Sequence, residues 1–263
     1  TVAMGNPYNY RNKLQFPVGI DKNGEPIIGV FANRTHEIIP IQGCAIQDIK
    51  SIQIAKYVVD AIKKYNLSVY DENIGKGLMR HVIVKAAKST GEYMVILVVN
   101  SNKLPYSQEI AESLVGECSS ITSVIVNINT KNTNVILGDK NITVYGKDYI
   151  IDKLGDYYFK ISPLSFYQVN PVQAEALYNY AIEAAEITKN DVAFDLYCGI
   201  GTISIFMAKS AKEVYGVEIV EQAIVDAKEN AKINGIDNTE FIVGDTEKIL
   251  DELINASCFN RFD

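Results

Sequence analysis

The stretch FDLYCGIGTISI, residues 194–205, decides how the second half of the chain folds. The apolar run that leads into it predicts a short buried strand, Gly199 and Gly201 predict a turn, and TISIFMAKSA predicts a helix. This order points backbone N–H groups at a ligand beside a helix N-terminus. Ser204 stands where the dinucleotide fingerprint has its third glycine, so the stretch fits either a cofactor turn or a tight structural turn.

Acidic residues at the following strand ends favour the cofactor interpretation. EVYGVEI (213–219) predicts a second strand and EFIV (240–243) a third, with Glu218 nineteen residues after Gly199 and Asp245 just after the third strand. A carboxylate at the end of the second strand can accept hydrogen bonds from ribose hydroxyls, although a solvated surface carboxylate would look the same. We expect the nucleoside-binding residues to be Asp195, Gly199, Gly201, Glu218 and Asp245.

The nature of the nucleoside follows from what surrounds the turn. The phosphate-cradling motif G-x-x-x-x-G-K-[ST] does not occur in the sequence. Asp195, just before the turn, suits a cationic ligand better than a pyrophosphate. S-adenosylmethionine carries a sulfonium and an ammonium, so we expect it as the cofactor.

Composition indicates a two-domain globular protein. The 263 residues are 48% hydrophobic, and the longest apolar runs, such as MVILVV (94–99), are too short to cross a bilayer. The four cysteines are widely spaced without a C-x-x-C, and the sequence shows no signal peptide. We therefore expect a cytoplasmic protein without a membrane partner, and a monomer.

Charge is divided unevenly along the chain. Residues 151–263 hold 9 basic and 19 acidic side chains, whereas residues 1–70 hold 8 basic and 5 acidic ones. We therefore expect an RNA partner to contact the N-terminal part of the chain, residues 1–70. In YRNK, Arg11 and Lys13 lie beside Tyr10, a combination that can contact phosphate and stack on a base, although an ordinary charged surface turn fits equally well.

The first 160 residues predict a separate α+β unit. IKSIQIAKYVVDAIKKY (49–65) has the apolar spacing of an amphipathic helix, and a second helix is expected near 106–117. A third helix is expected from Asn170, a good N-cap followed by Pro171, to about residue 187. Strands are expected at 81–87, 92–100, 121–129 and 141–145.

Four motifs followed by an acidic strand end resemble one family. The motifs are YRNK (10–13), GLMRH (77–81), SFYQVNP (165–171) and DLYCGIGT (195–202). In this order they are similar to the RNA 5-methyluridine methyltransferases, S-adenosylmethionine-dependent enzymes acting on uracil C5. The resemblance covers essentially the whole chain. It implies an α/β fold class: a central α+β domain at 1–162, then at 163–263 the N-terminal part of a Rossmann-like class I methyltransferase domain. It implies an RNA substrate, with rRNA favoured over tRNA.

The resemblance also implies roles for single residues. It adds three cofactor contacts to those above, namely Gln168, Tyr197 and Thr202. Together with the charge pattern, it assigns RNA contacts to Arg11, Lys13, Arg80, Phe166 and Tyr167. Alternatively, Arg80 forms a salt bridge with Glu72 or Glu92, and the two aromatic residues pack in a hinge between domains.

The catalytic residues of the family are expected outside this chain. Uracil C5 accepts a methyl group only after a thiolate has added to C6. In the family this cysteine follows an Asp-Pro-Pro-Arg-like motif, which the sequence lacks, and the chain ends near an expected fourth strand. We therefore expect no catalytic residue in this chain and no activity from it alone. Cys198, on the cofactor turn, is expected to be buried.

Cys44 resembles, in GCAIQ, the fourth ligand of the [4Fe–4S] cluster that many family members carry. The other three thiolates would precede residue 1, so the cluster is expected only in a longer protein. A lone cysteine is otherwise usually a small buried hydrophobe. Two other functions stay open: a methyltransferase that acts on another RNA base or acceptor, and an RNA-binding module without catalysis.

Overall fold

The computed structural model describes residues 2–35 and 37–249, which form two compact units. Of these described residues, the first unit comprises 2–35, 37–152 and 169–171, and the second comprises 153–168 and 172–249. The division comes earlier than the expected boundary after residue 162. Residues 153–162 group with the second unit because their strand packs against a helix there, with Lys160 N donating to Asn230 Oδ1 at 2.7 Å.

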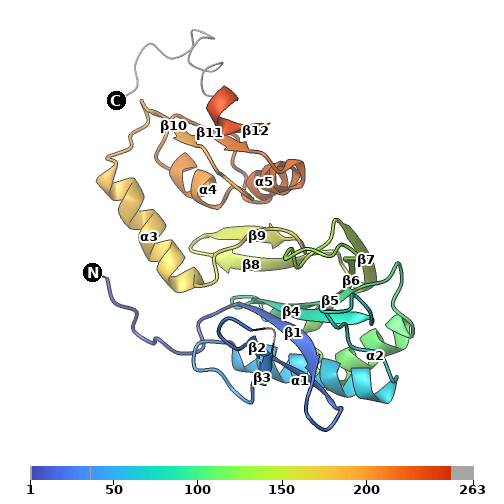
Figure 1. Cartoon of the computed structure of the whole chain (residues 1–263). Helices are drawn as coiled ribbons and strands as arrows, with labels where there is room; N and C mark the ends of the chain where they lie inside the picture. The colour runs from blue at the N-terminus through green and yellow to red at the C-terminus, as the bar shows by residue number, and fades with distance from the viewer. Residues whose placement is uncertain (1, 36, 250–263) are drawn as a thin grey trace. The chain divides into compact units, whose positions relative to one another are not determined.

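The first unit is built on a seven-stranded sheet with the order β3-β2-β1-β4-β5-β6-β7 (Figure 1). Its strands are β1 (Lys13–Ile20), β2 (Pro26–Phe31), β3 (Ile38–Pro40), β4 (Met79–Ala87), β5 (Glu92–Val99), β6 (Ile121–Ile128) and β7 (Lys140–Gly146). All neighbours are antiparallel except β5 and β6, which α2 (Ser107–Glu117) connects as a parallel crossover. The four strands and two helices expected for this unit are thus confirmed.

The core of the first unit lies between this sheet and its helices. Helix α1 (Ile49–Lys64) and α2 cover one face of the sheet (Figure 1). Strand β4 is buried along its whole length. Helix α1 begins where Asp48 accepts a hydrogen bond of 2.9 Å from Ser51 N. The hydroxyl of Tyr93 donates to the same carboxylate oxygen at 3.1 Å, so the cap is tied to the sheet.

Strands β1 to β3 were not expected, because Pro17, Gly19 and Gly29 weaken the strand pattern. The glycines have a packing reason. A Cβ on Gly19 would lie 2.5 Å from the side chain of Ile38, and one on Gly29 would lie 1.9 Å from the carbonyl oxygen of Ile39. These two positions therefore allow β3 to approach its neighbours.

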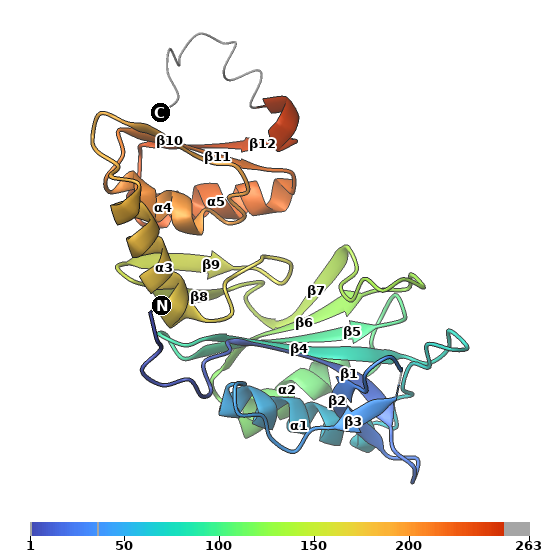
Figure 2. The same cartoon turned by 60° about the vertical axis from the view of Figure 1, so that its left-hand side comes forward.

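The second unit contains a parallel three-stranded sheet with two helices on one face (Figure 2). Its elements are β10 (Val192–Asp195), α4 (Thr202–Ala208), β11 (Glu213–Glu218), α5 (Glu221–Ile233) and β12 (Thr239–Val243). Strand, glycine turn and helix follow one another as the sequence predicted. The chain has the expected mixed α/β, Rossmann-like class.

The remaining elements precede this sheet. A two-stranded sheet of β8 (Ile150–Leu154) and β9 (Tyr157–Ile161) was not expected. Helix α3 (Pro171–Ala184) begins at the expected proline but ends before 187, because Glu186 adopts a positive φ of 50°. No helix within residues 2–35 and 37–249 is long and apolar enough to cross a bilayer. The expected fourth strand and Cys258 lie outside the described residues.

Candidate cofactor-binding site

The three predicted acidic residues lie at or just after the ends of parallel strands, so they reach the same edge of the sheet. In the register of the sheet, Asp195 of β10 pairs with Gly216 of β11, and Glu218 of β11 pairs with Val243 of β12. The pairing continues past the strand end, since Gly244 N donates to the Glu218 carbonyl oxygen at 2.9 Å. This carboxyl edge is where open α/β sheets bind ligands.

The turn after β10 has the backbone conformation that glycine favours. Gly199 has φ 53° and Gly201 has φ 79°, and Gly201 N donates to the Cys198 carbonyl oxygen at 2.8 Å. A Cβ on Gly201 would meet the ring of Phe241 at 2.9 Å, whereas one on Gly199 would meet nothing within 4 Å. Gly201 is therefore required for packing, and Gly199 leaves open space beside the turn that a ligand can use.

Two carboxylates lie close together at this edge. Burial raises the pKa of Asp195, and the nearby charge of Glu218 raises it further, against the lowering effect of the Ser204 hydrogen bond at 2.6 Å. Glu218 Oε1 accepts a hydrogen bond of 3.0 Å from Val220 N, which fixes that carboxylate at the strand end. Like charges held near each other create a site that a cation or a hydrogen-bond donor stabilises.

Both carboxylate oxygens of Asp245 contact residues of the turn that follows β12. Its Oδ1 accepts from Glu247 N at 3.2 Å, and its Oδ2 lies 3.4 Å from Lys248 Nζ. Thr246, which the sequence did not single out, donates from Oγ1 to the Leu196 carbonyl oxygen at 2.5 Å. This hydrogen bond ties the segment after β12 to the segment after β10.

Exposed apolar side chains lie next to these carboxylates. Tyr197 is 78% exposed, and Ile219, Val220 and Val243 are exposed as well. Each stands at or just beyond the end of a strand. An apolar ring that packed against these side chains would shield them from water. Only Tyr197 was predicted; the other three could have been found as apolar residues flanking the expected strand ends.

The other two predicted cofactor residues lie on neighbouring segments. Thr202 begins α4, and its Oγ1 is 3.2 Å from the hydroxyl of Tyr178 on α3. Gln168 is half-buried. The two aromatic residues before it differ in exposure. Phe166 is 68% exposed, whereas Tyr167 is 8% exposed and its ring centroid lies 6.3 Å from that of Phe159. Of the two aromatic residues that were assigned to the RNA, only Phe166 faces solvent, and Tyr167 packs beside Phe159.

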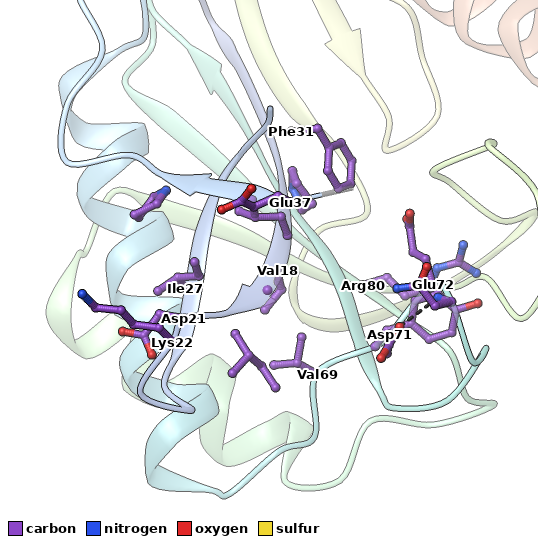
Figure 3. Close-up of a pocket in the computed structure, with 17 residues that line it drawn as sticks. Val18, Asp21, Lys22, Ile27, Phe31, Glu37, Val69, Asp71, Glu72 and Arg80 are labelled. Atoms are coloured by element: carbon purple, nitrogen blue, oxygen red, sulfur yellow. Dashed lines mark hydrogen bonds between the residues drawn. The ribbon is translucent and has the colours of Figure 1, made fainter. Parts of the chain in front are cut away.

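Arg80 is held inside the first unit. It is 4% exposed, its Nη1 donates to the carbonyl oxygens of Asn129 and Lys131 at 2.8 Å each, and its guanidinium lies 4.5 Å from the ring centre of Tyr70. Arg80 also lines a cavity of about 560 Å³, together with Asp71 and Glu72 (Figure 3). Four acidic side chains line this cavity (Asp21, Glu37, Asp71 and Glu72) against two basic ones (Lys22 and Arg80), so it disfavours phosphate.

Arg11 and Lys13, the predicted phosphate contacts, lie close to each other at the start of β1. Arg11 Nε donates to the Lys13 carbonyl oxygen at 3.1 Å. Burial lowers the pKa of Lys13, and the adjacent charge of Arg11 lowers it further. Two neighbouring cations of this kind favour the approach of an anion.

The two cysteines of interest differ in surroundings. Cys198 is buried, as expected, and burial raises the pKa of its thiol, with further contributions from Asp195 and Glu218. Cys44 is half-buried against the core of the first unit. Across residues 2–35 and 37–249, no three His, Cys, Asp or Glu side chains are grouped so as to hold a metal ion, so these residues alone do not fit a cluster.

Comparisons with known proteins agree with this geometry. A family described as a methyltransferase domain matches residues 187–263. A protein of Clostridium tetani named an uncharacterized RNA methyltransferase is 49% identical over 253 residues, which is 96% of this chain and 55% of that protein. An uncharacterized RNA methyltransferase of Clostridium acetobutylicum is 47% identical over 254 residues, 97% of this chain and 55% of that protein. The chain thus spans about half the length of the curated relatives it matches.

A solved structure is similar over both units. The crystal structure of Pyrococcus abyssi tRNA (uracil-54, C5)-methyltransferase in complex with S-adenosyl-L-homocysteine aligns with a TM-score of 0.75 at 26% identity. The alignment covers 92% of this chain and 57% of that one. The likeness therefore extends well beyond the glycine turn.

Proposed function

This chain is similar, over nearly its whole length, to proteins named uncharacterized RNA methyltransferases. From that premise we propose that it binds S-adenosylmethionine and serves the C5 methylation of a uridine in RNA. The observation that carries the proposal is the position of Asp195, Glu218 and Asp245 at the carboxyl ends of three parallel strands, the first of which leads into the glycine turn. The cofactor supplies an electrophilic methyl group on its sulfonium.

Each part of the carboxyl edge suits a different part of this cofactor. Glu218, fixed by Val220 N, is in position to accept hydrogen bonds from ribose hydroxyls. Exposed Tyr197 and Ile219 offer an apolar surface to adenine. Asp195, held by Ser204, offers negative charge beside the turn to the cationic end.

Calorimetric titration with S-adenosylhomocysteine tests the cofactor site without requiring turnover. Glu218→Gln should weaken binding by about 1–3 kcal/mol, because hydrogen bonds to a charged acceptor are lost. Glu240→Gln, the same change in an exposed residue of β12, should leave affinity unchanged. A folded wild-type chain that binds neither S-adenosylhomocysteine nor S-adenosylmethionine would contradict the proposal.

The uracil-C5 assignment rests on the motif order and on the Pyrococcus abyssi enzyme, whose substrate is named as tRNA uracil-54. In the whole protein we propose that a cysteine outside this chain adds to C6 of the uracil, which makes C5 nucleophilic. The whole protein must then place the methyl group of the cofactor beside C5 of the bound uracil. Mapping 5-methyluridine by mass spectrometry, in rRNA and tRNA from cells lacking the gene, tests the base and the RNA class together. Loss of a different methylated base would overturn the assignment.

RNA phosphates are proposed to meet the first unit at Arg11 and Lys13. Each phosphate neutralised releases counterions, so binding should weaken steeply with salt. Arg11→Gln and Lys13→Gln should each reduce the slope of log affinity against log salt by roughly one. Lys209→Gln, in the acidic second half, is the matched control and should leave the slope unchanged.

A [4Fe–4S] cluster with Cys44 as one of its four ligands stays a prediction, and it applies only to a protein longer than this chain. Four thiolates hold a [4Fe–4S] cluster, and this segment contributes one at most to such a set. Iron analysis of the whole protein, wild type against Cys44→Ser, tests that contribution.

A further inference from the structure

The segment that leads into α3 has an unusual alternation of exposure. Phe166 is 68% exposed, while its two neighbours, Ser165 and Tyr167, are each 8% exposed. The backbone is therefore anchored on both sides of one solvent-facing aromatic ring. Such an arrangement presents the ring in a fixed place, and an aromatic ring is a stacking surface for a base.

The anchor is a buried carboxylate on another element. Asp226 of α5 is 1% exposed, and its Oδ2 accepts from Ser162 Oγ at 2.6 Å and from Ser165 Oγ at 2.8 Å. Its Oδ1 accepts from Gln222 Nε2 at 3.2 Å. The Asp226 carboxylate thus holds both serines of the turn SPLS (162–165) against α5.

The turn reinforces this contact locally. Ser162 N donates to Ser165 Oγ at 3.0 Å, which closes the turn before Phe166. On the other side of Phe166, the Tyr167 ring packs beside Phe159 of β9. The hydroxyls of Ser162 and Ser165 both reach the same carboxylate oxygen of Asp226, so one side chain of α5 holds both ends of the turn.

We propose that Asp226 is a positioning residue, which holds Ser162 and Ser165 so that Phe166 is presented to a base of the RNA substrate. The inference rests on the proposed function, because it takes the RNA as the partner of Phe166. A side chain that is already ordered loses less conformational freedom on binding. Asp226 therefore acts through Phe166, without touching the RNA.

The first experiment measures the anchor directly. The chain contains no tryptophan, so Phe166→Trp introduces a single fluorescent reporter at the presented position. Its steady-state anisotropy should fall when Asp226→Asn is added. Asn230→Ala is the matched control: Asn230 is also buried on α5, but it bonds Lys160 N and the Ile200 carbonyl oxygen instead. That control should lower Tm and leave the anisotropy unchanged.

The second experiment is a double-mutant cycle on binding of a single-stranded uridine oligonucleotide. Asp226→Asn should weaken binding about two- to tenfold, the loss expected when one side chain has to be ordered on binding. Added to Phe166→Ala, it should cause no further loss, because the residue it acts through is gone. The pair Ser162→Ala and Ser165→Ala should reproduce the effect if Asp226→Asn does not fold.

The outcomes separate the two proposals. If the wild-type chain binds no RNA, or Phe166→Ala binds like wild type, the proposed role of Phe166 fails and this inference fails with it. If Phe166→Ala weakens binding but a folded Asp226→Asn chain does not, or if the two effects add, only the positioning role is overturned. Unchanged anisotropy in Asp226→Asn would also overturn it.

Discussion

The hydroxyl of Ser204 donates a hydrogen bond of 2.6 Å to Oδ2 of Asp195, so the first turn of α4 holds the carboxylate at the end of β10. The sequence marked Ser204 as the residue that breaks the dinucleotide fingerprint. Its hydroxyl instead supplies a donor that a third glycine would lack. A buried carboxylate without this donor would be less stable in its charged form.

Removing this hydroxyl should therefore weaken the cofactor site. We expect Ser204→Ala to reduce affinity for S-adenosylhomocysteine by about 1–3 kcal/mol, since hydrogen bonds to charged groups are worth that much. Calorimetry at neutral pH measures the change. Ser210→Ala, just beyond the C-terminal end of α4, is the control and should bind like wild type. Equal affinity of Ser204→Ala and wild type would show that the hydrogen bond does not support binding.

Cys198 should react slowly with alkylating reagents in the folded chain. Burial, together with the charges of Asp195 and Glu218, raises the pKa of its thiol, and the thiolate is the reactive form. Half-buried Cys44 and Cys118 serve as internal comparisons. Iodoacetamide labelling near pH 8, followed by mass spectrometry of the peptides, should show Cys198 modified last. Labelling of Cys198 as fast as the other two would refute its burial in solution.

The carboxyl edge of the second unit could be predicted from sequence because its signals are local. A short apolar run, a glycine turn and an acidic residue after each strand lie within a few residues of one another. Strands β1 and β2 could not, because Pro17, Gly19 and Gly29 resemble turn residues until β3 is known to lie against them. Their strand character comes from neighbours distant in the chain.

Side-chain roles were harder to predict than elements. Phe166 and Tyr167 are adjacent aromatic residues, and only the packing of Tyr167 beside Phe159 decides which one faces solvent. The partnership of Ser165 with Asp226 joins residues 61 positions apart, which no periodicity reveals. Contacts of this kind depend on tertiary structure, and a single sequence does not encode them in a readable pattern.

Stability of the first unit should depend on His81 at mildly acidic pH. Burial, with a contribution from Arg80, lowers the pKa of His81 from 6.5 to about 4. Between these values the unfolded chain binds a proton that the folded chain does not, so stability falls as pH drops from about 6.5 to about 4. The full effect is at most about 3 kcal/mol.

Urea unfolding of wild type and His81→Phe, compared at several pH values across this window, measures that contribution. The variant should lose less stability than wild type as the pH falls, because it has no imidazole to protonate. Carboxylates titrate in both proteins and cancel in the difference. Parallel pH profiles for the two would mean that His81 is not buried in its neutral form.

A methyl group at Gly216 on β11 should destabilise the second unit. A Cβ there would lie 2.5 Å from Cδ1 of Phe241 and 3.1 Å from Cβ of Cys198, so the strand and the glycine turn would have to separate. Overpacking of this kind typically costs about 1–3 kcal/mol, and we expect Gly216→Ala to lower the free energy of unfolding by that amount. Gly116→Ala makes the same change within α2, where a Cβ meets nothing within 4 Å, and should instead stabilise the chain by about 0.5–1 kcal/mol. Chemical denaturation of both variants gives the comparison; a Gly216→Ala chain as stable as wild type would contradict the close packing of Phe241 against β11.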